Sequence, residues 1–352
     1  MSHDGLARCT LPALFVGVLL ASGPITADTL LVANKGEATL SFVDLESGEV
    51  VASVPTGAGP HEVAISPDGE TAVVADYGGE APGNSLTVVS VSRAEVLRTV
   101  DLGEHERPHG ILFLKDGDRV VVTVEGSRAV AVVDIRSGAV EKVVETGQEV
   151  SHMVALHGSR AYVANIGSGT MTVLDLDKGS RLESVETGEG AEGITVTPDG
   201  SQIWVTNRGA DTVSLVDPET LEVVKTLESE GFPIRAEVTP DGERVLVTNA
   251  RSSVLTVIET ATREVAKRVP IRIEAADPED RLFGDRFGDS SVPIGIEIAP
   301  DGDRAFIAHA NADRIQILDL ESWETLGTIT AGREPDGMAY STVDVKEGRE
   351  SG

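Results

Sequence analysis

The sequence predicts an all-β protein made of seven copies of one unit, each about 42 residues long and holding four strands. Apolar residues are mostly Val, Ile, Leu and Ala, with only 7 Phe, 3 Tyr and 2 Trp but 37 Gly. This composition is typical of many short strands joined by tight turns. A strand that ends in a short polar signature also recurs along the chain. Its copies are LVAN (31–34), VVAD (73–76), VVTV (121–124), YVAN (162–165), WVTN (204–207), LVTN (246–249) and FIAH (306–309).

Residues 1–27 precede the first copy and read as a secretory signal peptide. The run 11–22 (LPALFVGVLLAS) is apolar, follows a short head with Arg8, and is followed by small residues up to Ala27. It is shorter than the roughly 20 residues of a spanning helix, so a membrane anchor is the weaker alternative. The only cysteine, Cys9, would leave with this segment. We therefore expect a periplasmic or secreted protein without disulfides and without a membrane span after cleavage.

The strand after each signature alternates apolar and polar residues and ends in an acid in six of the seven copies, as in LSFVD (40–44) and TVLD (172–175). An acid at a strand end most often accepts backbone hydrogen bonds in the following turn. We therefore assign these acids, and the signature asparagines, structural roles. The residues concerned are Asp44, Asp134, Asp175, Asp217, Asp319, Asn34, Asn165, Asn207 and Asn249.

The last strand of each unit has the form P-x-G-hydrophobic and should lie innermost in a ring of stacked sheets. The chain ends with such a segment, DGMAYS (336–341), which lacks its own partners. It should complete the blade begun by the N-terminal strands, closing a seven-bladed β-propeller of four-stranded antiparallel blades. We place the propeller at 28–342, an insertion loop at 270–291 and a C-terminal tail at 343–352.

YVAN, WVTN and LVTN, followed by TVLD and TPDG, resemble the YVTN-repeat family of seven-bladed β-propellers, in particular YncE-like envelope proteins. The resemblance covers nearly all of residues 29–342. It implies an exported propeller, but it is nearly silent about function, because relatives include haem-binding domains and proteins associated with quinoprotein alcohol catabolism.

The charge balance excludes several partners. With 58 acidic and 29 basic residues, the formal net charge is −29, which repels nucleic-acid backbones and anionic membrane surfaces. We expect no nucleic-acid partner and a monomer. The sequence also lacks the GxGxxG, P-loop, HExxH, GxSxG and CxxCH motifs, which disfavours nucleotide, hydrolase and c-type cytochrome chemistry.

The residue after the first position of each innermost strand forms a ring around the axis. In five consecutive blades it is a potential metal ligand: Asp336, His61, His109, His152 and Glu192. Three imidazoles flanked by carboxylates suit a divalent transition metal at the channel mouth. The alternative is that these histidines are solvated or bonded to neighbouring carbonyls.

Four further residues are weaker candidates for ligand binding. Arg235, near the channel, could hold a carboxylate or phosphate, although an ion pair between blades is the favoured interpretation. His309 replaces the signature asparagine. Phe283 and Phe287 lie in the insertion loop, which could cover the channel.

These observations support an exported binding scaffold with no reaction of its own, whose protein or small-molecule ligand meets the channel mouth. One alternative is a metal-dependent hydrolase or oxidoreductase that uses the histidines, with Glu192 or Asp336 as base. Another, implied only by the resemblance, is an accessory to a quinoprotein dehydrogenase.

Overall fold

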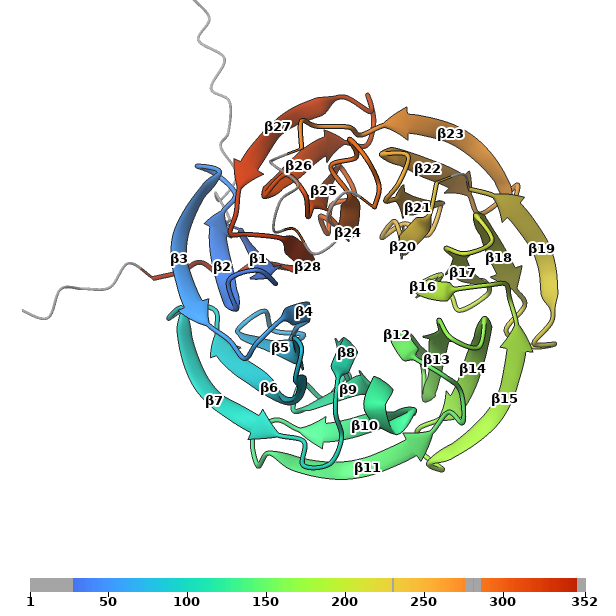
Figure 1. Cartoon of the computed structure of the whole chain (residues 1–352), viewed down its shortest axis with the longest axis horizontal. Helices are drawn as coiled ribbons and strands as arrows, with labels where there is room; N and C mark the ends of the chain where they lie inside the picture. Colours follow the sequence, from blue (N-terminus) through green and yellow to red (C-terminus); the bar gives the residue numbers. More distant parts are fainter. Residues whose placement is uncertain (1–27, 230, 276–280, 282–285, 347–352) are drawn as a thin grey trace, which may run out of the picture.

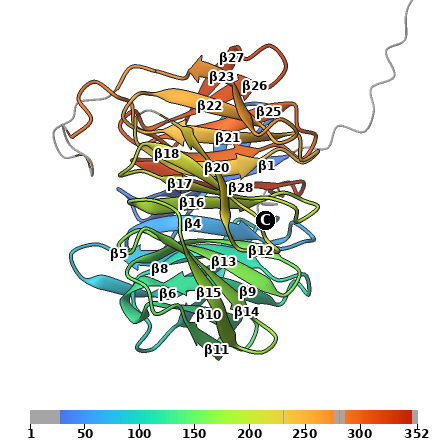
Figure 2. The same cartoon turned by 90° about the vertical axis from the view of Figure 1, so that its right-hand side faces the viewer.

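The computed structural model describes residues 28–229, 231–275, 281 and 286–346. Seven four-stranded antiparallel sheets stand around a central channel, which confirms the predicted propeller (Figure 1). Seen from the side, the sheets follow one another from β11 at one edge of the disc to β27 at the other (Figure 2).

Each blade contains one strand of each predicted kind, in the order inner, signature, acid-ending and outer. The inner strands are β4 (Pro60–Ile65), β8 (Pro108–Phe113), β12 (Ser151–His157), β16 (Ala191–Val196), β20 (Pro233–Val238), β24 (Pro293–Ile298) and β28 (Pro335–Ser341). The signature strands are β1 (Thr29–Asn34), β5 (Thr71–Gly78), β9 (Arg119–Val124), β13 (Arg160–Asn165), β17 (Ile203–Asn207), β21 (Arg244–Asn249) and β25 (Arg304–His309).

The two remaining strand kinds lie farther from the axis. The acid-ending strands are β2 (Thr39–Asp44), β6 (Pro82–Ser90), β10 (Ala129–Asp134), β14 (Thr170–Asp175), β18 (Thr212–Val216), β22 (Val254–Glu259) and β26 (Arg314–Asp319). The outer strands are β3 (Glu49–Pro55), β7 (Glu95–Asp101), β11 (Ala139–Glu145), β15 (Ser180–Glu186), β19 (Val223–Glu228), β23 (Glu264–Pro270) and β27 (Thr325–Thr330).

The two ends of the chain share one blade, as the sequence predicts. β28 pairs with β1, from Thr29 opposite Ser341 to Asn34 opposite Pro335, in the sheet β28-β1-β2-β3. Beyond β28, Val343 and Val345 pack against the apolar cluster that holds β1, β2 and β5 together. The last described residues therefore belong to the packed ring.

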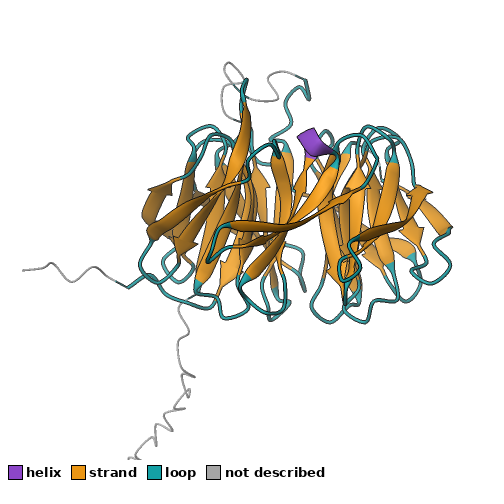
Figure 3. Cartoon of the chain, turned by 90° about the horizontal axis from the view of Figure 1, so that it is seen from below, coloured by secondary structure: helices purple, strands orange, loops and turns teal. Residues whose placement is uncertain are grey.

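The described helical structure is one 3₁₀ turn, η1 (Glu125–Ser127), which lies at one face of the disc (Figure 3). Within the described ranges, no helix is long and apolar enough to cross a membrane.

Apolar side chains from facing sheets interlock between the blades. One cluster joins Val73 and Leu86 of one blade to Val120 and Val133 of the next, and all four side chains are fully buried. The predicted turn acids are confirmed as structural, since the carboxylate of Asp134 accepts from the amides of Arg136 and Ser137. The same contact recurs after β2, β14, β18 and β26.

Candidate metal site in the central channel

A β-bulge in every inner strand turns two successive residues toward the axis. In β4, Pro60 pairs with Asp76 and Val63 with Val74, so three steps along β4 match two along β5. The other six blades carry the same one-residue excess. Because the extra residue breaks the in-out alternation, both bulge residues can face the channel.

The first bulge residue of all seven blades lines a cavity of about 360 Å³ at one end of the channel, which we call the mouth chamber. These residues are His61, His109, His152, Glu192, Ile234, Ile294 and Asp336. The second bulge residue lines a cavity of about 300 Å³ farther along the channel, the lower chamber, in five blades. These residues are Glu62, Met153, Arg235, Gly295 and Gly337.

Glycine at the second position lets neighbouring inner strands approach closely. A Cβ at Gly110 would lie 2.7 Å from the carbonyl oxygen of His152 on the next blade, and one at Gly295 would lie 2.0 Å from that of Asp336. The hydroxyl of Thr123 also donates to the His152 carbonyl at 2.6 Å. This close approach brings the first bulge residues of adjacent blades into contact.

The three predicted histidines lie together. The ring centroids of His61 and His109 are 4.8 Å apart, and those of His109 and His152 are 3.6 Å apart. His61 Nδ1 lies 2.8 Å from the carbonyl oxygen of Gly59, so it must donate there, and its Nε2 keeps a lone pair. His109 is 1% exposed, and its buried Nδ1 has no hydrogen-bond partner among the residues that the structure describes.

A second ring of residues in the same chamber was not predicted from the sequence. The residue directly after the four-residue signature lines this chamber in five blades: Lys35, Tyr77, Glu125, Ile166 and Arg208. In all seven blades its backbone N–H donates to the residue before the inner strand, and that residue has a left-handed φ, as in Val150 (55°) and Phe232 (67°). Comparing the blades one position beyond the signature would have found this ring.

Glu125 forms a group of three candidate ligands with His109 and His152. Its Oε1 lies 2.5 Å from His152 Nδ1, and its Oε2 accepts from the Tyr77 hydroxyl at 2.8 Å. One donor atom from each of His109, Glu125 and His152 lies within 4.8 Å of the others. Glu125 is the first residue of η1 and directly follows Val124, the last residue of β9.

Burial and nearby charges shift the pKa values of the three histidines in different directions. Burial lowers the pKa of His61 and of His109 well below the ordinary value, and the charges of Lys35 near His61 and of His152 near His109 add to this effect. Burial also disfavours the charged form of His152, but its contacts with Glu125 and Glu192 outweigh this and raise its pKa. Neutral His61 and His109 are the form that ligates a metal.

Glu192 and Asp336, the two predicted flanking carboxylates, lie in the mouth chamber but are paired with cations. Glu192 contacts Arg208 at 2.6 Å, and Asp336 contacts Lys35 at 3.0 Å. Burial alone would raise the pKa of both carboxyls, but the cations and nearby histidines lower it for each. Glu125 is therefore the carboxylate that is grouped with His109 and His152 as a possible metal ligand.

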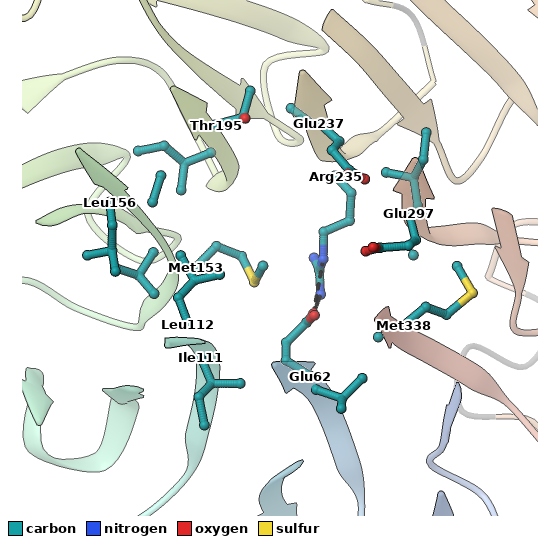
Figure 4. A pocket seen from close by; sticks show the side chains of 18 of the residues that line it. Glu62, Ile111, Leu112, Met153, Leu156, Thr195, Arg235, Glu237, Glu297 and Met338 are labelled. Atoms are coloured by element: carbon teal, nitrogen blue, oxygen red, sulfur yellow. Dashed lines mark hydrogen bonds and ion pairs between the residues drawn. The ribbon is translucent and has the colours of Figure 1, made fainter. Parts of the chain in front are cut away.

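Arg235 separates the two chambers. Its guanidinium reaches across the channel to Glu62, with Nη2 2.6 Å from Oε1 (Figure 4). It also lies 3.3 Å from Glu192 and 3.9 Å from Asp336. Burial lowers the pKa of Arg235, but these carboxylates outweigh it and raise the pKa overall. The ion pair between blades that the sequence favours for Arg235 is therefore present.

Below Arg235, the lower chamber carries two further carboxylates on mostly apolar walls. Glu237 Oε1 accepts from the amide of Ile298 at 3.3 Å, and Glu297 Oε1 accepts from the amide of Tyr340 at 3.1 Å. Burial raises the pKa of Glu297 to about 8, and it raises that of Glu237 well above the usual range with the help of the Glu297 charge.

The remaining predicted ligand residues lie in different surroundings. His309 is fully buried inside its blade, with Nδ1 2.8 Å from the Ser291 hydroxyl and Nε2 3.0 Å from Gln316 Oε1, so both ring nitrogens are used structurally. Phe283 falls outside the described residues. Phe287 is 8% exposed and packs on Phe232, with ring centroids 5.0 Å apart, beside the mouth chamber.

Comparisons with known proteins agree with the fold. No curated protein matches the chain in sequence. Among solved structures, Kuenenia stuttgartiensis hydrazine synthase has a TM-score of 0.66 and 22% identity, over 78% of this chain and 88% of that one. A functionally unknown protein from Desulfotomaculum acetoxidans has a TM-score of 0.74 and 14% identity, over 90% of this chain and 99% of that one.

A third similar structure is the dihydro-heme d1 dehydrogenase NirN in complex with DHE, with a TM-score of 0.62 and 16% identity over 89% of this chain and 75% of that one. At these identities the structures share the fold alone. The family model described as the YncE-like beta-propeller matches residues 120–278. The match and the closed ring of seven blades together show a seven-bladed β-propeller that is YncE-like over residues 120–278.

Proposed function

We propose that this chain is an exported binding propeller that holds a divalent transition-metal ion in its mouth chamber. His109, His152 and Glu125 are the ligands, and His61 is the next donor in reach. Two imidazoles and a carboxylate are a donor set suited to zinc and to similar divalent ions.

The observation that carries this proposal is the unpartnered Nδ1 of His109. A buried polar atom without a hydrogen bond costs about 1–3 kcal/mol, and His109 Nδ1 is such an atom. The other ring contacts of His109 are with His61, Tyr77 and His152, none of which satisfies that nitrogen. A metal ion accepts the lone pair of a neutral imidazole, which the lowered pKa of His109 supplies at neutral pH.

The donor spacing requires a small inward movement. The three donors lie within 4.8 Å of one another, whereas donors about 2.1 Å from a tetrahedral ion lie about 3.4 Å apart. The longest separation would therefore shorten by about 1.4 Å. The hydrogen bond from Tyr77 to Glu125 supports the carboxylate from behind, as an outer-shell partner would.

Catalysis is less well supported than binding. In the metal-dependent enzyme considered from the sequence, Glu192 or Asp336 would act as the base. Both are paired with cations, and the pKa of each lies below the usual range, so neither takes up a proton readily at neutral pH.

Isothermal titration calorimetry with zinc, nickel and copper(II) on chelator-treated protein tests the proposal. The expected result is one ion per chain, with affinity at least about 100-fold weaker in His109→Ala and in Glu125→Gln. The matched control is His157→Ala, because His157 is exposed at the far end of β12 and does not line the mouth chamber. Equal affinity in wild type and His109→Ala, or no uptake of any of the three ions, would refute the site.

Export is the second part of the proposal and rests on residues 1–27. Removal of about 27 residues is expected for a secretory signal, so the intact mass of protein from the envelope fraction should begin at Asp28. A retained Met1 in cytoplasmic protein would contradict it.

A further inference from the structure

The mouth chamber carries a cationic surplus in a strongly acidic protein. Its lining has four cationic side chains, Lys35, Arg208, Arg235 and Arg286, against three carboxylates. The whole chain has a formal net charge of −29. A divalent ion on the histidines would add two more positive charges, so the chamber attracts an anion although the surrounding protein does not.

The three carboxylates of the chamber are already paired. Asp336 contacts Lys35, Glu192 contacts Arg208, and Glu125 contacts His152. Arg235 is taken up by Glu62 and Glu192. These pairs leave Arg286 as the surplus cation.

Arg286 has no ion pair with any residue in the part of the chain that the structure describes. Its guanidinium lies over the rings of Phe232 and Phe287, 5.2 Å from each centroid, and its side chain reaches the mouth chamber from the end of the insertion. Stacking on aromatic rings uses the flat faces of a guanidinium and leaves its N–H groups, which point outward in the plane, able to bind a carboxylate with two hydrogen bonds.

The side of the mouth chamber next to Arg286 is apolar. Ile234 and Ile294 are the first bulge residues of β20 and β24, the blades nearest Arg286, and both pack in the same cluster as Phe232 and Phe287. The histidines stand on β4, β8 and β12, across the ring from β20 and β24 (Figure 1). A ligand held by Arg286 therefore lies against hydrocarbon side chains, which favours an organic anion over an inorganic one. The blades between these isoleucines and the histidines carry the paired residues Glu192 and Asp336.

We infer that the mouth chamber binds a small organic dicarboxylate, with one carboxylate on the metal ion and the other on Arg286. This inference rests on the proposed metal site. A volume of about 360 Å³ places the chamber at the small end of known ligand pockets, which suits a short acid chain.

The test is calorimetric titration of the zinc-loaded protein with succinate. Acetate, inorganic phosphate and 1,4-diaminobutane are titrated in parallel as the monocarboxylate, the inorganic anion and the cation of matched length. Succinate should bind at least about tenfold more tightly than acetate or phosphate, and the diamine should not bind. Arg286→Gln should weaken succinate at least about tenfold and leave the affinity for zinc unchanged.

Arg93→Gln is the matched control, because Arg93 is an exposed cation in the turn after β6, outside both chambers. If zinc binds but succinate does not, or if succinate binds equally well to Arg286→Gln, the dicarboxylate inference is wrong and the metal site stands. If phosphate binds as tightly as succinate, the organic assignment is wrong. If zinc itself does not bind, the proposed function fails and this inference fails with it.

Discussion

Replacing Arg235 by Met should destabilise the ring through one specific residue, Glu62. The guanidinium of Arg235 contacts Glu62 twice, through Nε at 3.2 Å and Nη2 at 2.6 Å. Glu192 keeps Arg208, and Asp336 keeps Lys35. Of the three carboxylates that Arg235 contacts, Glu62 alone would be left without a cation among the described residues.

The size of the effect follows from that orphaned charge. Breaking a buried ion pair from one side costs about 3–5 kcal/mol. The unfolding entropy near the midpoint is about 2.1 cal/mol/K per residue, and the ring runs from Thr29 to Ser341. The melting temperature should therefore fall by about 5 to 8 °C in Arg235→Met.

Thermal melts of four proteins decide the matter: wild type, Arg235→Met, Glu62→Gln and the double variant. Adding Glu62→Gln to Arg235→Met should restore most of the lost stability, because a neutral amide tolerates the site without a cation. Arg251→Met is the control, since its pair with Asp211 is about half exposed and should contribute at most about 1 kcal/mol. An unchanged midpoint in Arg235→Met, or no rescue in the double variant, would show that Arg235 does not neutralise Glu62.

Three further outcomes are expected. Burial raises the pKa of Glu297 to about 8, so the folded state holds a proton that the unfolded chain releases near pH 4.5, and the free energy of unfolding should fall as pH rises from about 5 to 8. Melts of Glu297→Gln at several pH values should show a flatter profile and at least about 1 kcal/mol more stability than wild type at pH 8. Parallel profiles of the two proteins would contradict this expectation. A chain ending at Glu334 lacks β28 and should lose the cooperative melt of the ring, whereas one ending at Lys346 should melt as wild type does; an intact melt without β28 would mean that the shared blade is dispensable. The charge of −29 predicts no mobility shift of duplex DNA at physiological salt and a melting temperature that rises with added salt, and tight DNA binding would contradict the first part.

The architecture was predictable because the same sequence pattern recurs in every blade. Seven copies of the signature strand, the acid before the turn and the P-x-G segment specify strand kind, order and radial position together. The orphan segment 336–341 then requires the shared blade, since β1 would otherwise present an open edge. The adjacency of His61, His109 and His152 follows from the same blade order.

Side-chain pairing in the channel was not predictable in the same way. Glu192 and Asp336 share a ring position with the histidines, but their partners Arg208 and Lys35 come from the ring one residue beyond the signature. Glu125 was not predicted for the same reason, because the predicted ligands were all taken from the inner strands. Arg286 lies in an insertion without a counterpart in other blades, so no comparison of repeats could place it.

The bulge explains why such a repetitive fold can carry an individual site. The strand faces that pack between blades hold apolar residues with almost no exposure, whereas the two bulge residues contact the channel and the neighbouring inner strand. A side chain at the first bulge position can therefore change without disturbing the packing between sheets. The second position is more restricted, because the neighbouring inner strand passes close to the glycine there. Where another residue replaces the glycine, its side chain must enter the channel, as that of Arg235 does. Arg235 then needs the carboxylate of Glu62 from the opposite wall, so the divider between the chambers is a direct consequence of two blades that lack this glycine.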